Sequence, residues 1–188
     1  MGPGTEYHRV MLEDGLVQVY TGYGKGKTTA AFGLALRAAG RGLRVKIVQF
    51  LKGPDLELGE RMAVVNWHLP IQIEAVAGRA GRNALAPGST QQTRTTIDAY
   101  LRQLLQEASG GLWDVLILDE LAFCLAKGLA DMGLVRQIIS SKARHTELVI
   151  TGRDAPAELL EMADLVTSMD NIKHPYDKGL KARQGIEY

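Results

Sequence analysis

The chain has 188 residues, of which 46% are apolar, so it is long enough for one domain with a single hydrophobic core. Its 22 basic and 21 acidic side chains leave a net charge of +1, which argues against a global field that would attract nucleic acid or an anionic membrane. The single Cys124 excludes an intrachain disulfide, and no stretch approaches the ~18 apolar residues of a membrane span. We therefore expect a cytoplasmic protein that binds its partners at local sites.

The first predicted strand covers Leu16–Tyr20 and follows residues 1–14, which we expect to form a flexible N-terminal segment. The glycine-rich stretch Thr21–Thr29 comes next and leads into an alanine-rich helix. The sequence GKT at residues 26–28 matches the end of the nucleotide-binding pattern G-x-x-x-x-G-K-[ST], whereas Thr21 replaces its opening glycine. A strand, a glycine-rich turn and a helix in this order predict a phosphate-binding loop.

The residue types in this loop suit the recognition of a phosphate chain. Glycines let backbone N–H groups turn toward phosphate oxygens, and the following helix points its positive end at the same place. Lys27 would neutralise phosphate charge, and the Thr28 hydroxyl would reach a Mg²⁺ ion. A glycine-rich turn with exposed lysines is the alternative, which the order of the flanking elements disfavours. The predicted nucleotide contacts are Gly22, Tyr23, Gly24, Lys25, Gly26, Lys27, Thr28 and Thr29.

A second strand is predicted over Val45–Phe50, where it is stopped by Lys52-Gly53-Pro54. Gln49 and Lys52 therefore lie at the carboxyl end of this strand. Open α/β sheets bind their ligands at that edge.

The next stretch, Asp55–Leu69, has weak helical character, and Ile71–Val76 is predicted as a strand. The loop Ala77–Gly88 is longer than most connections and contains Arg79 and Arg82. These arginines would either meet an anionic substrate group or be solvated loop charges, and the sequence favours neither.

A long helix is predicted from Ser89 to Gly110-Gly111, with an apolar stripe that we assign to the core and to no chemistry. The run Val115–Leu118 has the character of a buried parallel strand, and it ends at Asp119 and Glu120. Downstream of a phosphate loop, this acidic pair matches the Walker-B arrangement that holds the metal. The alternative is a carboxylate that caps the next helix.

Asp131 is predicted to cap a short helix, and Glu147–Thr151 to form the following strand. Arg153 comes just after this strand, where it would contact phosphate or substrate. A short helix over Pro156–Ala163 and a last strand over Leu165–Met169 complete the alternation, and from the residues alone the tail beyond them is a frayed basic terminus. The pattern predicts an α/β fold of the P-loop NTPase-like (RecA-like) type, with one domain over residues 15–188 and a mostly parallel sheet.

Five blocks of the sequence, in order, resemble the ATP:corrinoid adenosyltransferases of the CobA/BtuR type. The resemblance covers nearly the whole chain from about Leu16 onward, and in this family threonine opens the phosphate loop, as Thr21 does here. The tail also resembles the C-terminus of the family. The blocks are residues 21–31, 48–53, 118–121, 150–153 and 173–179.

The resemblance implies a reaction in which cobalt(I) of a reduced corrinoid attacks C5′ of ATP and displaces tripolyphosphate, in the biosynthesis or salvage of cobalamin. Lys27, Thr28 and Glu120 would then be the catalytic residues. Thr28, Glu120 and Asp119 would hold Mg²⁺ or Mn²⁺, and Arg153 would contribute to nucleotide binding. The resemblance further implies a homodimer and a flavoprotein reductant, with no nucleic-acid or membrane partner.

One block departs from the family pattern. Relatives carry aromatic residues in a Gly-Phe-Thr-Trp sequence after the strand near Val76, and these rings help to remove the lower ligand of the corrinoid cobalt. This chain has Gly78-Arg79-Ala80-Gly81 there, although Trp67 or Trp113 would be able to compensate from elsewhere in the fold. The departure concerns corrinoid recognition and leaves the predicted ATP site intact.

Three alternative functions compete with this reaction. A P-loop ATPase or kinase would transfer the γ-phosphoryl group with the same lysine, threonine and acids. A RecA-like nucleic-acid-binding module would use the basic tail and the loop arginines, but the near-neutral net charge argues against it. A divergent member of the family would bind nucleotide and corrinoid mainly to store or deliver the cofactor.

Overall fold

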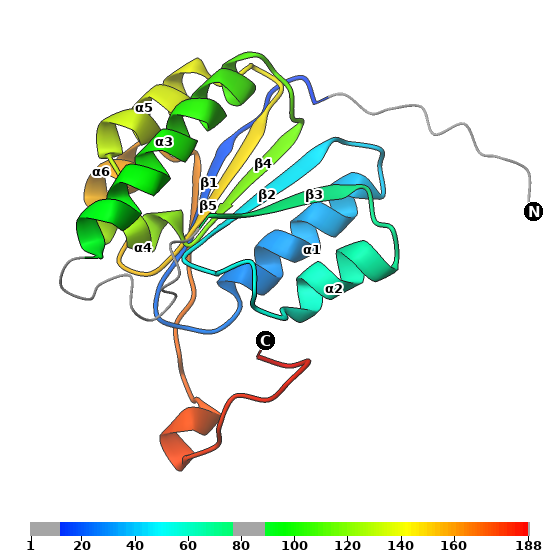
Figure 1. Ribbon diagram of the computed structural model, residues 1–188, viewed down its shortest axis with the longest axis vertical. Coiled ribbons are helices and arrows are strands. Elements are labelled where there is room, and N and C mark those ends of the chain that lie inside the picture. The colour runs from blue at the N-terminus through cyan, green and yellow to red at the C-terminus, as the bar shows by residue number, and fades with distance from the viewer. Residues whose placement is uncertain (1–11, 77–88, 188) are drawn as a thin grey trace, which may run out of the picture.

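The computed structural model describes residues 12–76 and 89–187, and at their centre lies a six-stranded parallel sheet in the order β3-β2-β4-β5-β1-β6 (Figure 1). Because every pair of neighbouring strands is parallel, all carboxyl ends meet at one edge of the sheet. This is the expected P-loop NTPase-like α/β architecture. The strands are β1 (Val17–Thr21), β2 (Val45–Phe50), β3 (Ile71–Val76), β4 (Val115–Asp119), β5 (Glu147–Thr151) and β6 (Leu165–Ser168).

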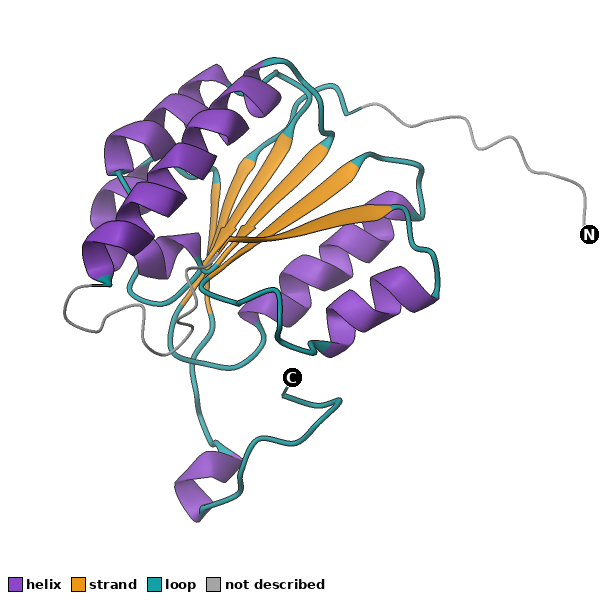
Figure 2. Cartoon of the chain, in the orientation of Figure 1, coloured by secondary structure: helices purple, strands orange, loops and turns teal. Residues whose placement is uncertain are grey.

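Helices cover both faces of this sheet, as Figure 2 shows by its separation of helix and strand layers. One face is covered by α1 (Lys27–Ala39) and α2 (Gly59–Asn66). The other face is covered by α3 (Thr90–Ser109), α4 (Leu121–Ala126), α5 (Met132–Ser141) and α6 (Ala157–Glu161). A 3₁₀ helix, η2 (Pro175–Lys178), follows the last strand.

The composition of the central elements explains this layering. Every residue of β2 and β4 is buried, which is expected of strands covered on both faces. Small side chains at Ala31, Ala35 and Ala38 bring α1 close to the sheet. The predicted apolar stripe of α3 belongs to the core, because Ile97, Leu101 and Leu104 are fully buried, while Tyr100 and Leu105 pack at its margin.

Most predicted elements are confirmed. The strands expected at residues 45–50, 71–76 and 147–151 have these bounds, and Asp131 caps α5 by accepting hydrogen bonds from the backbone N–H groups of Gly133 at 2.6 Å and Leu134 at 3.2 Å. The weakly helical stretch Asp55–Leu69 is shortened to α2, which begins at Gly59, after turns at residues 51–55.

The tail differs from the frayed terminus that its composition suggests. After η2 it returns to the phosphate loop, where Lys25 Nζ donates to the carbonyl oxygen of Ile186 at 3.0 Å and pairs with Glu187 at 3.2 Å. Among the described residues, no helix is long and apolar enough to cross a membrane. The predicted loop Ala77–Gly88, with Arg79, Arg82 and the Gly78–Gly81 departure, lies outside the described residues, as does most of the segment 1–14.

Candidate active site

The glycine-rich loop between β1 and α1 is shaped by close contact with the chain after β6. Gly22 has a φ angle of +90°, and a Cβ atom at this position would lie 2.5 Å from the carbonyl oxygen of Met169. A Cβ atom at Gly24 would lie 2.6 Å from the same oxygen, which instead accepts a hydrogen bond from the Gly24 N–H at 2.5 Å. Both positions therefore require glycine, because any side chain would push the loop off its support.

Lys27 is the first residue of α1, and its side chain turns back into the loop. Its Nζ donates hydrogen bonds to the carbonyl oxygens of Gly22 at 2.6 Å and Gly24 at 2.8 Å, and the residue is only 7% exposed. Burial lowers the pKa of Lys27 below its ordinary value, although the nearby carboxylate of Glu120 acts in the opposite direction. The loop thus surrounds a cation at the positive end of a helix, an arrangement that favours an anion.

Thr28 and Asp119 are 91 residues apart in the sequence and meet at the carboxyl edge of the sheet. The Thr28 hydroxyl donates to Asp119 Oδ1 at 2.9 Å, and the Thr151 hydroxyl donates to the same oxygen at 2.7 Å. On the other carboxylate oxygen, Oδ2, Asp119 accepts a hydrogen bond from Lys52 Nζ at 2.7 Å. Because Asp119 is fully buried, these donors keep its carboxylate in a defined orientation beside the loop.

Glu120 stands at the turn between β4 and α4 in a left-handed conformation with a φ angle of 66°. Its backbone N–H donates to the Thr151 hydroxyl at 3.0 Å, and its carboxylate accepts no capping hydrogen bond from α4. The helix-cap alternative is therefore not what the structure shows. Burial raises the pKa of Glu120, and Asp119 adds to this effect, while Lys52, Lys27 and Arg153 oppose it.

The remaining predicted contacts are distributed around the loop. Tyr23 donates its hydroxyl hydrogen bond to Asp154, which lies after β5, and Lys25 is bound by the tail as described above. Thr29 and Arg153 are exposed, and Arg153 acts on Lys27 by lowering its pKa. The structure therefore brings Lys27, Thr28, Asp119 and Glu120 together, with Arg153 at the margin.

Two side chains of this site were not among the predicted site residues, namely Thr151 and Lys52. Thr151 is the last residue of β5, and Lys52 follows β2, whose residue Gln49 pairs with Asp119 in the sheet. The signal for Lys52 was its place at the carboxyl end of a predicted strand. What the sequence lacked was the order of the strands, which makes β2 the neighbour of β4.

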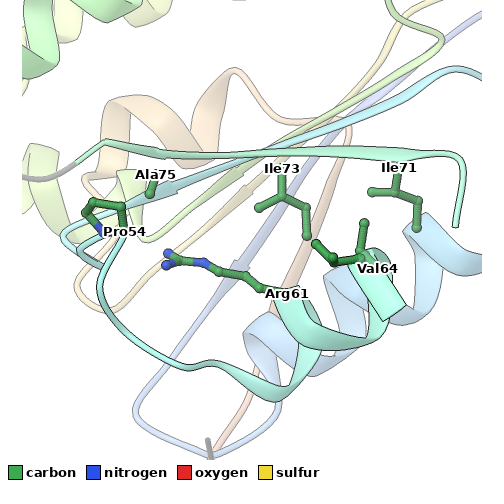
Figure 3. A pocket seen from close by; sticks show the side chains of 7 residues that line it. Pro54, Arg61, Val64, Ile71, Ile73 and Ala75 are labelled. Atoms are coloured by element: carbon green, nitrogen blue, oxygen red, sulfur yellow. The ribbon is translucent and has the colours of Figure 1, made fainter. Parts of the chain in front are cut away.

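A pocket of about 390 Å³ lies beside this site, between α2 and the edge strand β3 (Figure 3). Its lining is mostly apolar, and none of the phosphate-loop residues contributes to it. The guanidinium of Arg61 reaches from the pocket toward the chain after β2. Lining residues are Pro54, Arg61, Val64, Val65, Ile71, Ile73 and Ala75.

The fold and the loop define a P-loop NTPase-like protein. In agreement with this class, the structure is similar to the crystal structure of the flagellar accessory protein FlaH from Methanocaldococcus jannaschii, with a TM-score of 0.53. The similarity covers 86% of this chain and 74% of that chain at 14% sequence identity, so it bears on the fold alone.

Sequence comparison then gives the family. Residues 13–188 match the family model described as ATP:corrinoid adenosyltransferase BtuR/CobO/CobP. The chain is 36% identical to the corrinoid adenosyltransferase of Escherichia coli strain K12, over 94% of this chain and 87% of that protein. It is 35% identical, over the same shares, to the corrinoid adenosyltransferase CobA of Salmonella typhimurium. The chain belongs to this family of transferase enzymes, which confirms the resemblance seen in its sequence blocks.

Proposed function

We propose that the chain transfers the 5′-deoxyadenosyl group of ATP to the cobalt(I) of a reduced corrinoid and releases tripolyphosphate. Family membership supports the substrate class. The observation that supports the chemistry is the convergence of Lys27, Thr28 and Asp119 behind a glycine loop, because a buried cation and oxygen ligands at a helix N-terminus suit the binding of a triphosphate with its metal ion.

In this reaction the electron pair of cobalt(I) forms the new bond to C5′, while the C5′–oxygen bond breaks and its electron pair leaves with the triphosphate. No proton has to be removed, so the site needs no general base. The chain's own contribution is to stabilise the charge that collects on the leaving group. Lys27, which is largely buried, and the N–H groups of the loop would supply this stabilisation.

The oxygen ligands present fit a Mg²⁺ or Mn²⁺ ion. The Thr28 hydroxyl lies 2.9 Å from the Asp119 carboxylate, and the Glu120 carboxylate is close enough to Asp119 and Lys27 for both to act on its pKa. Hydroxyl and carboxylate oxygens are the ligands these hard cations prefer. When bound, such an ion would neutralise part of the triphosphate charge. Thr28, Asp119 and Glu120 would hold it.

The partners implied by the family form part of the same proposal. A second copy of the chain would complete a homodimer, and a flavoprotein would reduce the corrinoid in the cytoplasm. The tail would belong to the same site, since Lys25 of the loop binds the carbonyl oxygen of Ile186 and the carboxylate of Glu187.

The experiment that tests the proposal is an anaerobic assay with ATP, Mg²⁺ and a chemically reduced corrinoid. The spectrum of the adenosylcobalt product is followed while the phosphate product is identified by chromatography. We expect tripolyphosphate to appear in step with adenosylcobalt. ADP or orthophosphate without adenosylcobalt would instead identify a P-loop ATPase or kinase and would refute the proposal.

A matched pair of variants ties the assay to the site. Thr28→Val removes the hydroxyl beside Asp119, and we expect it to lower turnover by about 10²-fold, the usual scale for loss of one group that stabilises transition-state charge. Thr95→Val removes a hydroxyl of the same kind from an exposed position on α3, where it donates to the carbonyl oxygen of Gln91. This control should retain the wild-type rate.

A further inference from the structure

The ammonium group of Lys52 occupies the space between the groups that we assign to the metal. Lys52 Nζ lies 2.7 Å from Asp119 Oδ2 and 3.2 Å from the Thr28 hydroxyl oxygen. A divalent cation bound to Thr28 and Asp119 would have to take much the same place. Two cations at such short range repel each other strongly, so the position of Lys52 and the binding of a metal are in conflict.

The hydrogen bonds of Asp119 sharpen this conflict. Oδ1 accepts from two threonine hydroxyls, and Oδ2 accepts from Lys52 at 2.7 Å and from Gln49 Nε2 at 3.5 Å. A metal ligand must offer a lone pair, so one of these donors has to leave. Lys52 is the charged donor, and its side chain is 22% exposed, so it is the donor that electrostatic repulsion would displace and that has open space to move into.

The backbone around Lys52 is held independently of its side chain. Arg61 donates hydrogen bonds to the carbonyl oxygens of Lys52 at 2.9 Å and Gly53 at 2.6 Å, and to Gln49 Oε1 at 2.6 Å. Figure 3 shows this guanidinium extending from α2 toward the turn at Pro54. Because these bonds fix the turn, the flexible four-carbon stem of Lys52 is able to redirect its ammonium group without moving the chain.

We propose that Lys52 is an exchanging counter-ion of the site. Without nucleotide its ammonium group holds Thr28 and Asp119, and when the magnesium complex of the nucleotide binds it moves to the triphosphate. Lys52 thereby keeps the acidic groups neutralised before binding and adds a second cation, beside Lys27, to the phosphate chain afterwards. This inference rests on the proposed function only in that the site binds a triphosphate with a divalent cation.

The proposal predicts opposite effects of one substitution on two binding equilibria. In Lys52→Met, the affinity for Mn²⁺ alone, measured from the electron paramagnetic resonance signal of the free ion, should increase about tenfold, because the competing cation is gone. The affinity for the magnesium complex of β,γ-imido ATP, measured by calorimetry, should decrease about tenfold, because one phosphate contact is lost. Lys52→Arg keeps the positive charge and should lie close to the wild type in both measurements.

Two further variants keep the test decisive. Lys52→Gln retains a hydrogen-bond donor for Asp119, so it preserves the fold if Lys52→Met does not, and it should shift both affinities in the same directions. Arg102→Met removes a positive charge from an exposed position on α3 and should change neither affinity. The proposal is overturned if Mn²⁺ binding is unchanged without Lys52, or if nucleotide binding is unchanged or tighter. Neither measurement involves a corrinoid, so failure of the adenosyl-transfer proposal would be seen separately.

Discussion

Among the residues that the structure describes, two lysines are buried, and they differ in what surrounds them. Lys46, near the start of β2, is 1% exposed and pairs with Glu74 at 3.1 Å and Glu107 at 2.8 Å. Its Nζ also lies 5.6 Å from the ring centres of Tyr100 and of Trp113. Lys27, at the opposite edge of the sheet, is 7% exposed, and its Nζ donates hydrogen bonds to two uncharged carbonyl groups of the loop.

The difference separates a charge that serves the fold from one that remains available to a ligand. Two carboxylates and two aromatic faces satisfy Lys46, so a ligand has nothing to add there. Lys27 has given up water for neutral acceptors, and burial lowers its pKa. An anion that enters the loop would compensate the free-energy cost of removing Lys27 from water. Because Lys27 loses most of its water during folding, binding of the anion would not have to include that part of the cost.

Replacing the structural lysine should have the largest effect on stability. Lys46→Met leaves two partly buried carboxylates without their cation, and we expect the free energy of unfolding to decrease by about 3–5 kcal/mol. Urea denaturation followed by circular dichroism measures this loss, with Arg102→Met on the exposed face of α3 as the control for removal of a positive charge. A loss below about 1 kcal/mol would show that the ion pairs of Lys46 with Glu74 and Glu107 contribute little to stability.

Replacing Lys27, the lysine that we propose contacts the triphosphate, should affect turnover and leave the fold intact. We expect Lys27→Ala to lower the rate of adenosyl transfer by about 10²–10³-fold, because a cation directed at the leaving group is lost. Its free energy of unfolding should stay within about 1 kcal/mol of the wild type, since the buried charge was not paired with a carboxylate. A variant with the normal rate would refute the assignment of the phosphate loop.

The smallest expected effect is a change with pH in the stability that Lys46, Glu74 and Glu107 together contribute to the fold. Burial acts to raise the pKa values of Glu74 and Glu107. Hydrogen bonds, including those from Tyr100 to Glu74 and from Lys46 to both carboxylates, act in the opposite direction and outweigh burial. Both pKa values therefore lie below the ordinary 4.5. Carboxyl groups with lowered pKa values stabilise the fold above pH 4.5, and this contribution is lost as the pH falls through their folded-state pKa values.

The destabilisation caused by Lys46→Met should therefore shrink in acid. Once both carboxyl groups are protonated, they no longer need a cation. Urea denaturation of the wild type and the variant at about pH 7 and about pH 3.5 measures the change. A difference in stability that is the same at both values would mean that the two carboxylates do not respond to Lys46.

Much of the site was predictable because its signals are local. The order of strand, glycine loop and helix placed Lys27 and Thr28, and the apolar run before Asp119 placed that carboxylate at the carboxyl edge of the sheet. Parallel strands bring all such ends to one edge, so their convergence followed without knowledge of the strand order. Asp131 was predictable for the same reason, since a helix cap depends on neighbours in the sequence.

The features that sequence analysis missed depend on partners far away in the chain. Lys52 meets Asp119 because β2 lies next to β4, and the return of the tail to Lys25 depends on contacts made by Ile186 and Glu187. Lys46 lies within a predicted strand, and the sequence of that strand does not indicate whether the lysine side chain is buried or exposed. Only the packing of α3 over that strand supplies Glu107 and makes burial of the ammonium group tolerable.

The contact between the phosphate loop and Met169 bears on the order in which the protein matures during synthesis. The loop is translated early, yet β1 lies between β5 and β6, and the Gly24 N–H donates its hydrogen bond to the carbonyl oxygen of Met169, the residue that follows β6. A nascent chain that ends before Leu165 therefore contains the loop residues but lacks β6 and Met169, which contact the loop in the folded protein. We therefore expect the proposed nucleotide binding to arise only late, when the last strand has left the ribosome and joined the sheet.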